Sequence, residues 1–181
     1  MVSTQNSIIL WTGPKHSGKT TRATGLIKMA RAEGFIVAGI LEPSLYDNGE
    51  LLGFDVLDVQ NQKRTPLARR KKDRSTTGLF NFITDGLKFG NAVLSSEAIK
   101  SADLIVIDEF GPQEVNGQGW RRNIDSLLAL STAIILIIIR QELKDTFRKL
   151  YTGVPCLEVE ALEKNSAHEV IAILKTRRQP Q

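Results

Sequence analysis

The stretch "IILWTGPKHSGKTT", residues 8–21, joins an apolar run to a glycine-rich turn and a polar segment. Gly13, Gly18, Lys19 and Thr20 have the spacing G-x-x-x-x-G-K-[ST] of a phosphate-binding loop. The glycines permit a tight turn in which successive backbone N–H groups point at phosphate oxygens. The motif requires an apolar strand before the turn and a helix after it, and the flanking residues predict both. The stretch therefore predicts an α/β fold built around a bound phosphate.

The side chains of this loop have different expected roles. Lys19 can reach the β- and γ-phosphates of a nucleotide, and the Thr20 hydroxyl can ligate Mg²⁺. His16 lies in the variable middle of the loop, where a side chain generally points to solvent, so we expect no catalytic role for it. The remaining positions expected to bind the nucleotide are Gly13, Pro14, Lys15, Ser17, Gly18 and Thr21, together with His16.

A second stretch, "DLIVIDEFGPQE" at residues 103–114, places four aliphatic residues before a pair of carboxylates. A buried parallel strand would deliver Asp108 to the carboxyl edge of the sheet, where open α/β folds bind ligands. There Asp108 can hold Mg²⁺ opposite Thr20. Glu109 can orient or deprotonate a water molecule in line with the γ-phosphate, which favours hydrolysis. Glu114 either assists this chemistry or caps the loop.

Arg140 completes the predicted catalytic set with Lys19 and Glu109. It follows the most hydrophobic run of the chain, Ala133–Ile139, which we interpret as a central strand buried on both faces. Arg140 would then end at the same sheet edge as Asp108, where its guanidinium can stabilise charge on the γ-phosphate.

Apolar, β-branched runs alternate with helical patterns along the chain, which predicts a parallel sheet with helices on both faces. We expect one domain over residues 1–181. Asn48-Gly49 between two β-prone runs predicts a hairpin. We interpret this hairpin and the basic segment after it, about residues 43–78, as an insertion into the domain. The other predicted strands are 7–12, 35–42, 78–83, 103–108, 132–139 and 154–159; the predicted helices are 20–33, 85–100, 121–130, 141–150 and 166–175.

The composition narrows the class of protein. The 181 residues are 41% hydrophobic and 24% charged, as in an ordinary globular domain. The one cysteine, Cys156, excludes an internal disulfide and a multi-cysteine zinc site, and its alternating surroundings predict a buried thiol. No apolar run approaches the roughly 20 residues that span a bilayer, and the N-terminus lacks signal-peptide features. We expect a cytoplasmic protein with no membrane partner.

The net charge of +4 is concentrated in Lys63–Arg74, which has seven basic residues and one acidic residue and is expected to form a loop. Arg69 and Arg70 in this segment can contact phosphate. RNA or DNA binding is the less favoured interpretation, because no aromatic residues lie between the charges to stack on bases. Trp11 is expected in the core, whereas Trp120 either packs internally or covers a base.

The order of these segments resembles the small P-loop nucleoside-triphosphatases of the cancer-related type. The phosphate loop and its helix come first, then "GILEPSLYDNGELLGFDVLDVQNQKRTPLARR" at residues 39–70, then "DLIVIDEFGPQE". The resemblance covers residues 8–174. It implies a P-loop fold related to the RecA and AAA-type ATPases, with slow, Mg²⁺-dependent hydrolysis of nucleoside triphosphates of several bases.

Carried over by motif, the resemblance assigns Lys19 and Thr20 to the nucleotide, Asp108 to Mg²⁺ and Glu109 to the attacking water. Arg69 aligns with an arginine of the family. The predicted function is therefore Mg²⁺-dependent hydrolysis of ATP, GTP and other nucleoside triphosphates. Two alternatives stay open: a nucleotide or nucleoside kinase with the basic segment as its lid, and a nucleotide-dependent switch subunit that needs a partner. The sequence leaves the oligomeric state undecided.

Overall fold

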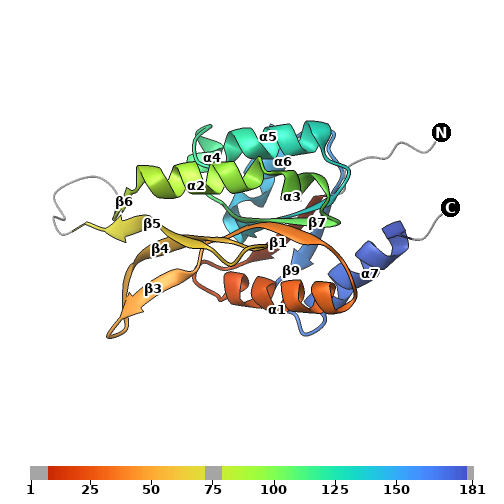
Figure 1. Ribbon diagram of the computed structural model, residues 1–181, viewed down its shortest axis with the longest axis horizontal. Helices are drawn as coiled ribbons and strands as arrows, with labels where there is room; N and C mark the ends of the chain where they lie inside the picture. Colours follow the sequence, from red (N-terminus) through yellow and green to blue (C-terminus); the bar gives the residue numbers. More distant parts are fainter. Residues whose placement is uncertain (1–7, 72–78, 179–181) are drawn as a thin grey trace.

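The computed structural model describes residues 8–71 and 79–178, and within them nine strands form one sheet with helices on both faces (Figure 1). The strands are β1 (Ile8–Gly13), β2 (Val37–Leu41), β3 (Ser44–Asp47), β4 (Glu50–Asp58), β5 (Arg64–Arg70), β6 (Phe80–Phe82), β7 (Leu104–Phe110), β8 (Ile134–Arg140) and β9 (Cys156–Glu160). The helices are α1 (Lys19–Ala32), α2 (Thr84–Leu94), α3 (Glu97–Lys100), α4 (Pro112–Val115), α5 (Arg121–Leu130), α6 (Lys144–Leu150) and α7 (Ser166–Arg178), with a 3₁₀ turn at Gln141–Leu143.

Five strands, in the order β2-β7-β8-β1-β9, form a parallel core. The central strand β8 lies between β7 and β1, and its first six residues, Ile134–Ile139, are all buried, as a strand covered on both faces requires. Because the strands are parallel, the carboxyl ends of β1, β7 and β8 meet at one edge of the sheet. This arrangement confirms the predicted P-loop α/β fold.

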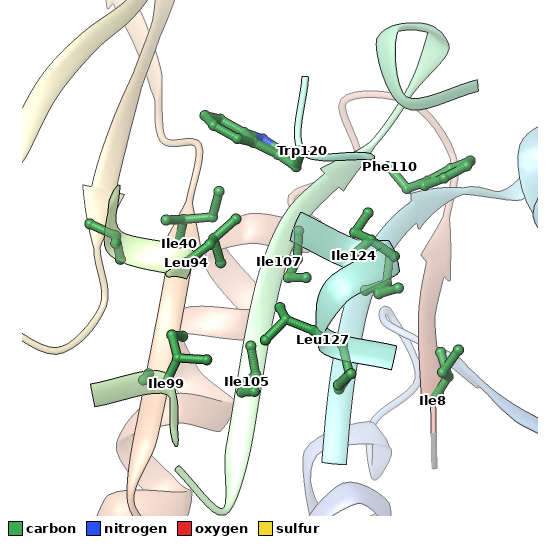
Figure 2. Close-up of a cluster of buried hydrophobic side chains, with 14 of the residues drawn as sticks. Ile8, Ile40, Leu94, Ile99, Ile105, Ile107, Phe110, Trp120, Ile124 and Leu127 are labelled. Atoms are coloured by element: carbon green, nitrogen blue, oxygen red, sulfur yellow. The ribbon is translucent and has the colours of Figure 1, made fainter. Parts of the chain in front are cut away.

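The helices cover the two faces of the sheet in separate groups. Helices α1 and α7 lie on one face, and α2 to α6 lie on the other (Figure 1). Trp11 is fully buried on the α1 and α7 face, as predicted. On the opposite face, Ile105 and Ile107 of β7 pack in one core with Leu94 and Ile124 (Figure 2). Within the described residues, none of the helices is long and apolar enough to cross a membrane.

Helix α1 ends where the sequence predicts. Gly34 has φ +81°, and the N–H of Gly34 donates to the carbonyl of Arg31. The N–H of Phe35 donates to the carbonyl of Ala30 at 3.0 Å. These two bonds form a Schellman motif, which stops a helix because glycine accepts the left-handed conformation without strain.

The hairpin is confirmed, but it extends the main sheet. Asn48 and Gly49 both have positive φ, 45° and 81°, as a two-residue hairpin turn requires. The second strand of the hairpin, β4, then pairs antiparallel with β2 through Ile40 and Asp58. The segment between β2 and α2 therefore adds four antiparallel strands beside the parallel core.

The predicted loop at Lys63–Arg74 is wrong for its first half, which is strand β5. Arg64 and Arg69 each donate to Asp55 of β4 at 2.6 Å. Leu67, which lies between the two arginines in the sequence, is buried. The many charges of the segment favoured a loop in the prediction. The structure shows a strand instead, because Asp55 of the neighbouring strand balances two of its arginines. Residues 72–78, which include the rest of the basic segment, lie outside the described residues.

The single helix predicted at residues 85–100 is divided into α2 and α3. The Ser96 hydroxyl donates to the carbonyl of Val93 at 2.7 Å, a side-chain bond that competes with the helical backbone. The segment between β7 and α5, for which the sequence predicts no helix, contains the short helix α4.

Candidate active site

The phosphate-binding loop joins β1 to α1. Gly18 adopts the left-handed conformation, φ +86° and ψ 20°, directly before the first residue of α1. The loop passes close to other groups at Gly13, where a β-carbon would lie 3.0 Å from Glu160 Oε1 and 3.3 Å from Ser17 Oγ. A side chain at either position would therefore disturb the turn, which explains the two glycines.

Lys19 is held beneath the loop. Its ammonium donates to the carbonyl of Pro14 at 2.8 Å, and the residue is 6% exposed. Burial lowers the pKa of the Lys19 ammonium, while the carboxylates of Glu109 and Asp108 act in the opposite direction. The Trp11 indole N–H donates to the Lys19 carbonyl, which ties the start of α1 to the strand before it.

Asp108 lies at the end of β7 and meets Thr20 of α1. The Thr20 hydroxyl donates to Asp108 Oδ2 at 2.7 Å, and the Glu42 backbone N–H donates to the same oxygen at 3.0 Å. Burial raises the pKa of Asp108 from 3.8 to about 6, and the charge of Glu109 adds to the rise; the two hydrogen bonds oppose it. A buried carboxylate with this pKa is suited to a cation partner, because a nearby positive charge favours its ionised form.

The donor set fits Mg²⁺. Thr20 Oγ1 and Asp108 Oδ2 are adjacent oxygens, and Mg²⁺ prefers oxygen donors. Residues 8–71 and 79–178 contain no cluster of three or more histidine, cysteine, aspartate or glutamate side chains that could hold a metal by itself. One or two protein ligands completed by water and phosphate oxygens are the usual arrangement for Mg²⁺ in nucleotide sites.

Glu109 and Arg140 form an ion pair beside Lys19 and Asp108. Asp108 pairs with Ile138 and Phe110 pairs with Ile139, so Glu109 is an extra residue in a bulge of β7. Glu109 Oε1 accepts from Arg140 Nε at 3.0 Å and from Nη2 at 2.7 Å. Both side chains remain about one quarter exposed, which leaves them accessible to a ligand.

One carboxylate of this site, Glu42, was not among the predicted site residues; it lies one residue beyond β2. Its Oε1 accepts from the Trp120 indole N–H at 2.7 Å. Burial and the neighbouring charge of Asp108 raise the pKa of Glu42 well above its usual value. Glu42 follows the apolar run "FIVAGIL" as Asp108 follows "LIVI", so the same pattern of an acidic residue after a buried strand could have found it.

These groups line one cavity of about 980 Å³. The loop side of the cavity includes Lys19, Thr20, Asp108, Glu109 and Arg140, and the cavity continues past Glu42 and Trp120 toward β3–β6. This volume lies at the upper end of the range for small-molecule sites. The predicted catalytic and metal-binding residues are therefore gathered around a space large enough for a nucleotide.

Comparison with known proteins identifies the family. A family model described as NTPase matches residues 8–172. The chain belongs to this NTPase family. It is 31% identical over 137 residues to the nucleoside-triphosphatase THEP1 of Methanothermobacter thermautotrophicus, covering 75% of this chain and 78% of that protein. It is 26% identical over 159 residues to the protein of the same name from Methanocaldococcus jannaschii, covering 86% of this chain and 91% of the other.

Two solved structures share the fold of this NTPase. The solution structure of a human cancer-related nucleoside triphosphatase aligns with a TM-score of 0.69 and 22% identity, covering 98% of this chain and 99% of that one. The crystal structure of THEP1 from Aquifex aeolicus aligns with a TM-score of 0.70 and 17% identity, covering 93% and 99%. The family match confirms the expected relationship, and it identifies the chain as an NTPase enzyme.

The structure also shows where the arginines expected to contact phosphate and the single cysteine lie in this NTPase. Arg69 donates to Asp55 and to the carbonyls of Phe54 and Ala68, and it does not line the cavity, whereas Arg70 does. The expected phosphate contact is therefore wrong for Arg69. Cys156 is only partly buried, and burial raises the pKa of its thiol.

Glu114 and Trp120 hydrogen-bond to each other in the segment that follows β7. The Glu114 carboxylate accepts the backbone N–H groups of Gly111 and Trp120, both at 2.9 Å, so Glu114 caps this loop. Trp120 is 2% exposed, and Figure 2 shows it with Phe110 at the end of the core where β7 ends. His16 is exposed and has φ 57°, in line with the expectation that it faces solvent.

Proposed function

We propose that this NTPase hydrolyses nucleoside triphosphates, ATP and GTP among them, to the diphosphate and inorganic phosphate with Mg²⁺ as cofactor. The observation that carries the proposal is the 2.7 Å hydrogen bond between Thr20 and Asp108 beside the buried Lys19. It joins the two halves of a phosphate and metal site that lie 88 residues apart in the sequence. The name nucleoside-triphosphatase of the two archaeal relatives supports this substrate class.

Each predicted residue has a role in this proposal. The backbone of residues 13–21 cradles the phosphates, and Lys19 contacts the β- and γ-phosphates. Thr20 and Asp108 would hold Mg²⁺, which when bound would supply charge neutralisation to the phosphate oxygens. Arg140 stabilises the negative charge of the terminal phosphoryl group in the transition state. Glu109 holds Arg140 in place and faces the attacking water.

The reaction is a displacement at the terminal phosphorus. The oxygen of a water molecule forms a bond to this phosphorus, while the bond between the phosphorus and the bridging oxygen breaks. The bridging oxygen keeps the electron pair and leaves as the nucleoside diphosphate. The water supplies the remaining oxygen of inorganic phosphate, and its protons leave with that phosphate or pass to solvent.

The test is phosphate release from ATP, GTP, CTP and UTP with Mg²⁺, measured for the parent, Lys19→Ala and Glu109→Gln. We expect the parent to release phosphate and both variants to lose most of this activity. Lys19→Ala should also weaken nucleotide binding, whereas Glu109→Gln should keep it. Absence of phosphate release from a parent protein that binds nucleotide tightly would refute the proposal.

Transfer of the phosphoryl group to another acceptor is the second candidate. The observation that favours it is the extension of the cavity to Phe54, Arg70 and Phe80, beyond the residues that a triphosphate would occupy. With γ-labelled nucleotide and an added nucleoside, a kinase would place the label on the nucleoside, whereas a hydrolase would release it as free phosphate.

A further inference from the structure

Glu42 lies beside Asp108 in the cavity, at a position that neither sequence motif covers. Ile40 of β2 pairs with Ile107 of β7, and two residues later the Glu42 N–H contacts Asp108 Oδ2 at 3.0 Å. Strand β8, which ends in Arg140, lies on the other side of β7. Asp108 is therefore flanked by Glu42 on the β2 side and by Arg140 on the β8 side, and both side chains line the cavity.

The Glu42 carboxylate is held in a fixed orientation by Trp120. The indole N–H donates to Glu42 Oε1 at 2.7 Å. The indole ring is itself confined, because it lies so close to Gly90 of α2 that a β-carbon there would approach Cη2 to 2.4 Å. On its backbone side, the Trp120 N–H is held by Glu114 at 2.9 Å. Packing and hydrogen bonding thus fix the donor that orients Glu42.

Glu42 and Glu109 differ in the partners of their carboxylates. Glu109 Oε1 accepts two hydrogen bonds from the Arg140 guanidinium, which neutralises the carboxylate with a cation. The partner of Glu42 is a neutral N–H, which orients a carboxylate without supplying a positive charge. With Oε1 turned to Trp120, the second carboxyl oxygen of Glu42 can accept a hydrogen bond from a water molecule in the cavity.

We propose that Glu42 accepts a hydrogen bond from the attacking water and thereby orients it toward the terminal phosphorus, with Trp120 as the positioning residue. This inference rests on the hydrolysis proposed above and adds a catalytic residue to it. Glu109 then acts chiefly by holding Arg140 against the terminal phosphate. The bonds that form and break are those of the displacement already described, and Glu42 contributes the orientation of the water.

The test compares Glu42→Gln with the parent in phosphate release and nucleotide binding. Glutamine keeps an oxygen that can accept the Trp120 N–H, so the fold should be retained, and an unchanged melting temperature checks this. We expect kcat to fall at least 100-fold, within the range typical of lost acid–base or water-orienting groups, while the nucleotide Kd changes less than twofold. Glu142→Gln is the matched control, since it removes an exposed carboxylate from the turn after β8; it should keep the parental kcat.

A double-mutant cycle tests the positioning role of Trp120. Trp120→Phe keeps an aromatic ring beside Gly90 and removes the N–H that holds Glu42. We expect this variant to lower kcat about tenfold in the parent and to have no further effect in Glu42→Gln, because the two residues act through one contact. A merely structural role for Trp120 would lower kcat equally in both backgrounds.

The outcomes separate this inference from the proposed function. If the parent releases phosphate and Glu42→Gln keeps the parental kcat, Glu42 does not orient the water and the inference is overturned, while hydrolysis stands. If Glu42→Gln weakens nucleotide binding as much as it lowers kcat, Glu42 serves binding and the inference is also overturned. If the parent itself releases no phosphate, the proposed hydrolysis fails.

Discussion

Gly90→Ala is a remote change that should alter both stability and catalysis. Gly90 lies inside α2, and an added β-carbon would be 2.4 Å from Cη2 and 2.6 Å from Cζ3 of Trp120. Ordinary carbon contacts begin near 3.4 Å, so the ring must move by about 1 Å. The same ring carries the N–H that donates to Glu42 at 2.7 Å, and a shift of this size would weaken that bond.

Two opposing effects set the magnitude. Overpacking of a well-filled site costs about 1–3 kcal/mol, while alanine in place of glycine inside a helix stabilises it by about 1 kcal/mol. The expected net loss in the free energy of unfolding is therefore about 0–2 kcal/mol. A displacement of about 1 Å in a group that supports the reacting atoms can lower kcat by about 100-fold.

The assay measures urea denaturation and steady-state phosphate release for Gly90→Ala and for a stability control, Gly25→Ala. Gly25 lies inside α1, where a β-carbon would meet no atom within 4 Å, so the control should gain about 1 kcal/mol from helix propensity alone. The difference between the two variants isolates the steric cost. A Gly90→Ala variant as stable as Gly25→Ala relative to the parent, with the parental kcat, would show that Trp120 does not crowd position 90.

Three further predictions concern stability. Gly86→Ala should lower the free energy of unfolding by about 3 kcal/mol in urea denaturation. The added β-carbon would lie 2.2 Å from the backbone oxygen of Pro66, which no rotamer change can move. A smaller loss than for Gly90→Ala would contradict this. Asp108→Asn should raise the melting temperature at pH 8 more than at pH 5. The pKa of Asp108 is raised from 3.8 to about 6 in the folded protein, so its ionisation costs no stability below pH 3.8. The cost grows to about 3 kcal/mol as the pH rises from 3.8 through 6, and asparagine avoids it. A larger gain at pH 5 than at pH 8 would refute the sign. Asp55→Asn should cost about 1–2 kcal/mol in thermal unfolding, because the partly exposed Arg64 and Arg69 lose their buried carboxylate partner. Phosphate release should stay at the parental rate, and a large loss of activity would place Asp55 in the site after all.

The glycine-rich turn at residues 13–18 and the position of Asp108 at the end of its strand could be predicted because their geometry is local. Gly13 and Gly18 adopt their turn within a single stretch of backbone, and the residue spacing specifies that turn. Asp108 could be placed because a buried parallel strand ends at one edge of the sheet. The hairpin turn at Asn48-Gly49 was equally local, since both residues needed positive φ.

Contacts between distant strands could not be predicted in the same way. The sequence made Arg69 a candidate for a phosphate contact, but its guanidinium is paired with Asp55 on the neighbouring strand. The break between α2 and α3 was also missed, because serines favour competing local hydrogen bonds that a periodicity argument does not weigh.

By itself the sequence determined the P-loop fold, and it placed Lys19, Thr20 and Asp108 at the same edge of the sheet. Only the tertiary structure decided which carboxylate has which partner: Glu109 with Arg140, 31 residues away, and Glu42 with Trp120, 78 residues away. The physical reason is that a loop motif specifies its own backbone, whereas the partner of a side chain at the end of a strand depends on the order of strands in the sheet. That order is set by the burial of whole strands and helices, and no short stretch of residues records it.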